Sequence, residues 1–151
     1  AVTGLDSGLG EPMFDSVESV LSHALFSIPA IKGVEFGAGF AIADMTGKEA
    51  NDEFCNNNGK ICTVTNNAGG INGGITNGMP VIFRCAVRPT PTLGTQQNTV
   101  NIETGENTVL QSKGRHDPCI VHRARIVVDC VTALALCDIL AGRYGTDWLG
   151  E

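Results

Sequence analysis

A chain of 151 residues is long enough to bury a hydrophobic core as one domain without metal ions or disulfides as staples. Charged residues make up 17% of the chain and hydrophobic residues 42%, which excludes a disordered protein. The net charge of -6 argues against a general nucleic-acid binder, because phosphate contacts need clustered lysine and arginine. Any anion that the chain binds must therefore be held by a local group of cations.

The pattern of residues 1–12 predicts an extended N-terminal segment followed by a turn. Apolar residues at helical spacing over 14–28 then predict a helix that ends at Pro29. Asp15 and Glu18 have the spacing of a capping box at its start.

A strand over 31–36 and a short helix over 40–45 are expected next. Residues 46–68, with a cluster of asparagines, predict an irregular and mobile segment. A glycine-rich loop over 66–78 leads into a strand over 80–87.

The last third predicts two weaker strands, around 100–102 and at Val109, that flank a turn at 104–106. A long helix over 120–140, ended by Gly142, closes the chain. Because strands and helices mix without regular alternation, the pattern favours an α+β fold over a doubly wound sheet.

Six cysteines without a CxxC pair favour reduced thiols over a disulfide scaffold. Cys130 and Cys137 lie in an apolar run, and both are predicted to pack as small hydrophobic residues on one helix face. The run is shorter than a membrane span and is interrupted by Asp129 and Asp138, so it indicates a buried helix. No leader pattern or glycosylation sequon occurs, so we expect a cytoplasmic location, with an organelle such as a plastid as the alternative.

The glycine-rich loop is either a set of structural turns or a place where a flat or anionic ligand meets backbone N–H groups. It matches neither the GxxxxGK[ST] phosphate loop nor the GxGxxG dinucleotide fingerprint.

Positive charge is concentrated late in the chain. Lys113, Arg115, Arg123 and Arg125 are four of the ten lysines and arginines, and His116 and His122 lie among them, while Arg84 and Arg88 flank the central strand. A solvated basic face would explain such a cluster. Against that interpretation, the run Arg88-Pro89-Thr90-Pro91-Thr92 combines a guanidinium, two hydroxyls and two stiff prolines, which suits a phosphate. We therefore expect an anion site.

Asp117 follows a cation and an imidazole and precedes Pro118. It could cap the final helix, with Pro118 at the first helical position. Alternatively it could transfer a proton, with a pKa tuned by the surrounding cations and by burial. His116, Cys119 and His122 have loosely ligand-like spacing, but no second ligand pair completes a set, so no metal site is predicted.

Together these motifs resemble the C-terminal part of chorismate synthase over nearly the whole chain. Five ordered blocks carry the resemblance: Gly8-Leu9-Gly10-Glu11-Pro12, Ser27-Ile28-Pro29-Ala30-Ile31-Lys32-Gly33-Val34-Glu35, Asn67-Ala68-Gly69-Gly70-Ile71-Asn72-Gly73-Gly74-Ile75, Arg88-Pro89-Thr90-Pro91-Thr92 and Gly114-Arg115-His116-Asp117-Pro118. The resemblance implies an α+β fold of the chorismate synthase type, a β-α-β sandwich.

The family is a lyase of the shikimate pathway, which leads to the aromatic amino acids. Its members convert 5-enolpyruvylshikimate 3-phosphate into chorismate by anti-1,4 elimination of phosphate and a ring proton. They require reduced FMN (FMNH2) without net redox change, and in some members NADPH supplies the electrons instead of a separate reductase. Residue by residue, the resemblance implies a catalytic Asp117 beside flavin N5. The implied FMN contacts are Pro29, Ala30, Gly73, Arg88, Pro89, Thr90, Pro91, Thr92 and Arg115.

Two departures from the family pattern matter. Many members have lysine where this chain has Arg88, which keeps the charge but changes the geometry. The family's first part, with its paired catalytic histidines and several substrate-binding arginines, has no counterpart, and His23, His116 and His122 lie outside those motifs.

We therefore expect residues 1–151 to be a single domain, the C-terminal FMN-binding portion of the enzyme, inactive without its N-terminal part. The expected partners are the phosphorylated substrate, that missing part and further copies in a homotetramer, with no nucleic acid and no membrane. A non-catalytic FMN-binding or phosphate-binding module, or an assembly module that binds nothing by itself, is the alternative.

Overall fold

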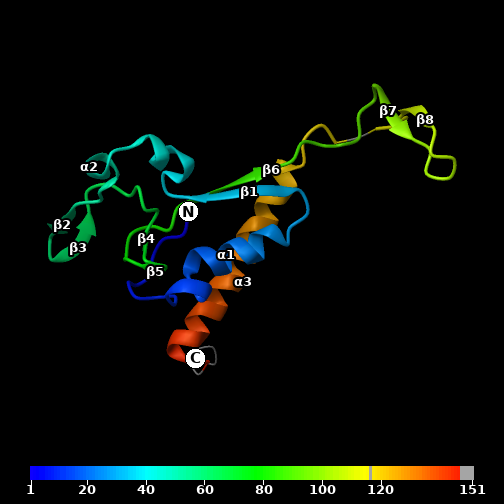
Figure 1. Cartoon of the computed structure of the whole chain (residues 1–151). Helices are drawn as coiled ribbons and strands as arrows, with labels where there is room; N and C mark the ends of the chain where they lie inside the picture. The colour runs from blue at the N-terminus through cyan, green and yellow to red at the C-terminus, as the bar shows by residue number, and fades with distance from the viewer. Residues whose placement is uncertain (116, 147–151) are drawn as a thin grey trace.

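The computed structural model describes residues 1–115 and 117–146, and its mixture of helices and antiparallel strand pairs confirms the predicted α+β class (Figure 1). In chain order the elements are η1 (Met13–Asp15), α1 (Val17–Phe26), β1 (Ile31–Phe36), η2 (Gly39–Asp44), α2 (Gly47–Ala50), β2 (Phe54–Asn57), β3 (Lys60–Thr63), β4 (Ile71–Asn72), β5 (Ile75–Thr76), β6 (Phe83–Val87), β7 (Gln96–Val100), β8 (Asn107–Gln111) and α3 (Val121–Tyr144).

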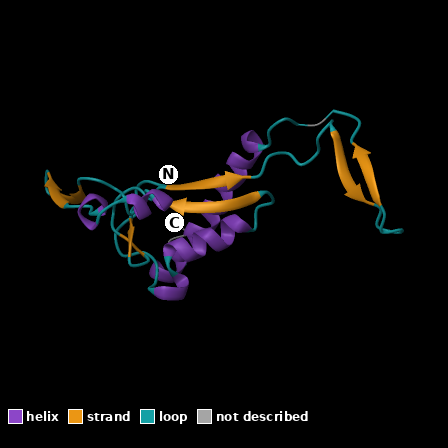
Figure 2. Cartoon of the chain, turned by 45° about the horizontal axis from the view of Figure 1, so that its top comes forward, coloured by secondary structure: helices purple, strands orange, loops and turns teal. Residues whose placement is uncertain are grey.

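The core lies between the antiparallel pair β1–β6 and the two long helices, α1 and α3, which lie together against one face of the strands (Figure 2). In β6 the alternate residues Phe83, Cys85 and Val87 pack against the core, as strand geometry requires. The fully buried side chains include Val17, Leu21 and Leu25 of α1, together with Val81 just before β6. Burying an aliphatic side chain contributes about 1.5–3 kcal/mol, so this cluster is the main stabilising element. The extended N-terminal segment joins it, because Val2 bridges Val81.

Helix α1 is confirmed, but its predicted start is wrong. The helix begins at Val17, after Ser16, whose Oγ accepts a hydrogen bond from Ser19 N at 3.1 Å. A serine in extended conformation places its oxygen against the free N–H groups of the first turn, so Ser16 and not the Asp15–Glu18 pair caps the helix. The residues before it form the separate turn η1, where Phe14 is 85% exposed.

The prediction that 46–68 is irregular is also wrong. The segment contains α2, which is capped at its start by a capping box of Thr46 and Glu49, and then the hairpin β2–β3. Its two turn residues, Asn58 and Gly59, have φ values of 53° and 89°. Positive φ at both central residues defines the type I′ turn, for which Asn-Gly is the preferred sequence. The asparagine cluster therefore marks a tight turn between two strands.

Hairpin β7–β8 confirms that two strands flank the predicted turn and that Val109 is in the second strand, but the first strand lies earlier than predicted, because it ends at Val100 and Ile102 is in the turn. It projects away from the rest of the chain, joined to β6 by residues 88–95 and followed on the other side by the described residues 112–115 and 117–120 (Figures 1 and 2). Every residue of β8 is exposed, and Ile102 in the turn is 99% exposed. Strand β6 begins three residues later than predicted, and η2 is a 3-10 helix at the predicted short helix.

The long last helix is confirmed, with a later end. α3 passes through Gly142 and ends at Gly145, where φ is 74°. A glycine within a helix lowers its stability by about 1 kcal/mol without breaking it, whereas the left-handed conformation at Gly145 does end the helix.

The predicted burial of α3 holds for one face only. Thr132, Ala135 and Leu136 are buried on the side that meets α1, whereas Cys130 and Cys137 are exposed. Residues spaced by three or four positions share a helix face, and here the cysteines share the outer face with other exposed apolar residues. We call this set the outer stripe of α3: Ile126, Cys130, Leu134 and Cys137. Within the described residues, no helix is both long and apolar enough to cross a membrane.

Candidate functional site

Three segments that are far apart in the sequence meet beyond the end of the β1–β6 pair. Arg88 N donates a hydrogen bond to Ala30 O at 2.7 Å, and Thr90 Oγ1 donates to Asp117 O at 2.9 Å. Asp117 Oδ2 in turn forms an ion pair with Arg123 Nη1 at 2.9 Å. We call these five residues the anion corner. It joins the end of α1, the chain after β6 and the start of α3.

The backbone of Ala30 is strained. Its φ is 74°, in the left-handed region that disfavours side chains, and the peptide after it runs directly into β1. For an L-residue this conformation costs about 1–2 kcal/mol. In this conformation the Ala30 carbonyl accepts the hydrogen bond from Arg88 N, and the neighbouring Pro29 is exposed. Such strain is often retained where it shapes a binding surface.

Arg88 belongs to the anion corner, and Arg115 lies two residues before Asp117. Both arginines are exposed. Neither has an acidic partner within residues 1–115 and 117–146. Both can therefore bind an external anion, for which a guanidinium offers several parallel donors. Thr90 and Thr92 beside Arg88 are half-buried. His116, which the sequence analysis counted with these cations, lies outside the described residues.

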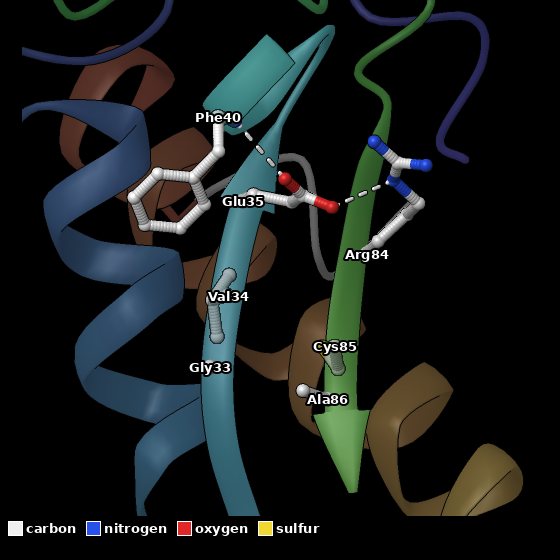
Figure 3. Close-up of a pocket in the computed structure, with 7 residues that line it drawn as sticks. All are labelled: Gly33, Val34, Glu35, Phe40, Arg84, Cys85 and Ala86. Carbon is white, nitrogen blue, oxygen red and sulfur yellow. Dashed lines mark hydrogen bonds and ion pairs between the residues drawn. The ribbon is translucent and has the colours of Figure 1, made fainter.

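Arg84 does not contribute to this group. Figure 3 shows it on β6, where its Nε lies 2.9 Å from Glu35 Oε1 on β1. The other oxygen of Glu35 accepts a hydrogen bond from Phe40 N at 3.2 Å. The pair lines an open pocket of about 250 Å³ on the strand face that looks away from the helices. Arg84 is thus neutralised by a partner that connects β1, β6 and η2.

Asp117 does not cap the final helix, and Pro118 is not its first residue. The helix begins at Val121 after Ile120, because the backbone bends at Pro118 and residues 119 and 120 are not helical. The Asp117 side chain is 49% exposed, so the expected burial is not present in this chain. Arg123 is one of the cations of the predicted cluster, but its ion pair with Asp117 was not predicted from the sequence. The six-residue spacing fits no helix face, so the bend before α3 is what brings the two charges together.

The glycine-rich loop forms the small hairpin β4–β5, with Gly73 exposed at its tip. Val17 N at the start of α1 donates to Gly74 O at 2.9 Å, whereas Ala30 lies beyond the other end of this helix. Ten helical residues span about 15 Å. The structure therefore brings Ala30, Arg88, Thr90 and Asp117 together and leaves Gly73 at the opposite end of α1.

Asp52 was also missed by the sequence analysis, because it lies in the segment predicted to be irregular. Partial burial tends to raise the pKa of its carboxyl, but hydrogen bonds from Thr65, Ala68 and Asn67 together hold the pKa below its usual value. Nothing in the local spacing predicts these contacts. Among the described residues, no three metal-binding side chains lie close enough together to hold an ion.

Comparison with known proteins gives the family. The model of the chorismate synthase family matches residues 1–141. The chain is 56% identical over 139 residues to the chorismate synthase of Chitinophaga pinensis, covering 92% of this chain and 41% of the relative. It is 49% identical over 136 residues to that of Methanocella arvoryzae, covering 90% and 37%. A crystal structure of chorismate synthase matches it with a TM-score of 0.74 and 32% identity, over 95% of this chain and 36% of the other.

These similarities and the mixed fold define the chain as part of an α+β enzyme. The chain is a member of the chorismate synthase family. This confirms the resemblance drawn from the sequence, and the structural match confirms the chorismate synthase type of fold. The chain spans about two-fifths of the length of the relatives that it matches.

Proposed function

We propose that this chain is the FMN-binding part of a chorismate synthase, a lyase that removes phosphate from 5-enolpyruvylshikimate 3-phosphate to give chorismate. The observation that carries the proposal is the anion corner with Arg115 beside it. A family member that has to bind two phosphorylated molecules holds two exposed arginines, Arg88 and Arg115, that have no acidic partner among the described residues, and Arg88 lies at the strained backbone of Ala30.

The charges at the corner suit this task. FMN and the substrate are polyanions, whereas the chain as a whole is acidic, so the cations that bind them have to be grouped. Arg88 and Arg115 supply fixed positive charge, and the prolines of the run after β6 keep Thr90 and Thr92 in place. The guanidinium of Arg88 offers two parallel N–H donors to a phosphate or carboxylate.

When bound, reduced FMN supplies electron density that assists cleavage of the carbon–oxygen bond to phosphate. Asp117 is the residue that we assign to proton movement near the flavin. Thr90 holds it through the backbone carbonyl and Arg123 through the carboxylate. The two contacts orient Asp117 from both sides, which a proton-transferring group needs in order to reach a defined atom.

The remaining part of the enzyme is required for turnover in this proposal. The chain covers 36–41% of its relatives, and the outer stripe of α3 exposes Leu134 to 70%. We propose that the missing part covers this stripe and completes the substrate site, and that the assembled enzyme is a cytoplasmic homotetramer. The isolated chain is then inactive.

The test is a flavin-fluorescence titration of the chain with FMN. Saturable quenching is expected, and Arg115→Ala should weaken FMN binding by about tenfold, the effect of one charge-assisted hydrogen bond. Lys60→Ala is the control, because Lys60 is an exposed cation on β3, away from the corner (Figure 1). Equal effects of the two variants would refute the assignment of the anion corner.

A second measurement separates an enzyme from a binding module. The chain is mixed with the missing part, reduced FMN and 5-enolpyruvylshikimate 3-phosphate, and chorismate is measured. Chorismate formation that Asp117→Asn abolishes supports the enzyme. FMN binding without any chorismate would favour the non-catalytic module, and absence of FMN binding by the folded chain would favour an assembly role.

A further inference from the structure

Outside the anion corner, the carboxylate of Asp52 accepts three hydrogen bonds. Its Oδ1 accepts from Thr65 Oγ1 at 2.6 Å and from Asn67 N at 2.8 Å. Its Oδ2 accepts from Ala68 N at 2.8 Å. Asp52 is half-buried and lies in the short connection between α2 and β2, and its side chain contacts residues that are 13 to 16 positions further along the chain.

Only an ionised carboxylate fits these three donors. Both oxygens receive an N–H or O–H group, and a carboxylate has acceptors only. An asparagine of the same shape would turn an N–H₂ group toward one of these donors and leave it without an acceptor. The lowered pKa of Asp52 agrees with this requirement.

The two amides that Asp52 holds begin the glycine-rich loop. Asn67 O accepts from Ala38 N at 2.8 Å, just after β1, and Gly69 O accepts from Ile82 N at 3.1 Å, just before β6. A Cβ atom on Gly69 would collide with the backbone of Gly37, so backbone meets backbone here without space for a side chain. The start of the loop is therefore packed closely against neighbouring backbone. A small displacement there also moves the residues that follow in the loop.

The hairpin with Gly73 at its tip continues this loop. Asp52 also lines an open pocket of about 420 Å³ together with Ala68 and Asn72, the residue before Gly73. Asp52 and the residue before the tip of the loop therefore line the same pocket. This geometry connects Asp52 to a predicted flavin contact that lies far from the anion corner.

We propose that Asp52 is a positioning residue, whose carboxylate fixes the start of the glycine-rich loop and so sets the place of Gly73 in the binding site. The flavin contact of Gly73 rests on the proposed function, whereas the hold of Asp52 on the loop does not.

The first test is amide hydrogen exchange by NMR on the chain itself. Asp52→Asn keeps the shape of the side chain and should accelerate exchange of the Asn67 and Ala68 amides by about tenfold or more, the loss of a charge-assisted hydrogen bond. Glu53→Gln is the matched control, since Glu53 is the exposed carboxylate next along the chain. Exchange in Asp52→Asn at the wild-type rate would overturn the proposal.

If Asp52→Asn does not fold, Thr65→Val decides the same question. It removes the hydroxyl that shares Oδ1 with Asn67 N and leaves the carboxylate in place. The Ala68 amide, held by the other oxygen, should then stay protected in this variant. If the Ala68 amide in this variant exchanged as fast as an amide without a hydrogen-bond partner, the proposal that Asp52 fixes the loop would be contradicted.

The second test adds FMN and separates positioning from a general structural role. Asp52→Asn should weaken FMN binding and shift the visible absorption spectrum of the bound flavin, while Glu53→Gln should change neither. An unchanged spectrum with a lower unfolding midpoint would mean that Asp52 only stabilises the fold. If the wild-type chain binds no FMN, the proposed function fails for this chain, and the exchange rates still decide whether Asp52 holds the loop.

Discussion

Replacing Ala30 by glycine should make the chain more stable, although the substitution removes a methyl group. Ala30 has a φ of 74°, which costs an alanine about 1–2 kcal/mol, whereas glycine adopts it freely. Glycine loses more backbone entropy on folding, which returns about 0.5–1 kcal/mol. The net gain in the free energy of unfolding is therefore about 0.5–1 kcal/mol. The hydrogen bond from Arg88 N to the Ala30 carbonyl does not involve the side chain and should persist.

Ala38→Gly is the matched control. Ala38 is also half-buried and also flanks β1, but its φ of −69° and ψ of −17° are ordinary for alanine. Glycine there should lower the free energy of unfolding by about 0.5–1 kcal/mol. Urea unfolding followed by circular dichroism measures both variants, and the expected difference of about 1.5 kcal/mol corresponds to roughly 3–6 °C in Tm. Equal destabilisation by the two substitutions would refute the strain at Ala30.

Three further predictions concern the rest of the chain. Because hydrogen bonds hold the pKa of Asp52 below its usual value, the contribution of Asp52 to stability is complete above about pH 4 and is lost as the pH falls through the lowered pKa. The midpoint of urea unfolding should therefore fall more steeply between pH 5 and 2 for the wild type than for Asp52→Asn. Parallel curves would contradict this. Gly69→Ala should destabilise the chain by about 3 kcal/mol or more, since its methyl group would meet backbone, whereas Gly73→Ala, which points into open space at positive φ, should cost about 1 kcal/mol. The hydrogen bond with the Cys62 thiol across the hairpin raises the pKa of Cys55, so iodoacetamide at pH 8 should alkylate the exposed Cys119 before Cys55, as mass spectrometry of the peptides can measure.

The elements that formed as predicted depend on short-range patterns. The apolar period of α1 buries one side of the helix wherever it packs, and the alternation in β6 does the same for a strand. The turn between β7 and β8 was equally visible as Thr104-Gly105-Glu106 between two β-rich runs. The hairpin β2–β3 was missed even though Asn58-Gly59 is a strong turn signal, because its polar strands lack the apolar alternation that the analysis required.

Short-range patterns did not predict how much of α3 is buried. Its sequence is apolar on two faces, so the sequence predicted a buried helix, yet packing against α1 covers only Ala135, Leu136 and their neighbours. Whether the outer stripe is buried depends on the surface that lies beyond it, which periodicity within the helix does not contain.

The family, the fold class and the residue types of the anion corner could all be predicted from the sequence, because ordered motifs and local propensities are properties of neighbouring residues. Which of those residues meet depends on tertiary packing. Packing placed Ala30 against Arg88 and Asp117 between Thr90 and Arg123, and it gave Asp52 its hold on the glycine-rich loop. These contacts join segments up to 58 residues apart, counted from Ala30 to Arg88, and their geometry comes from the packing of whole elements, which no local pattern specifies.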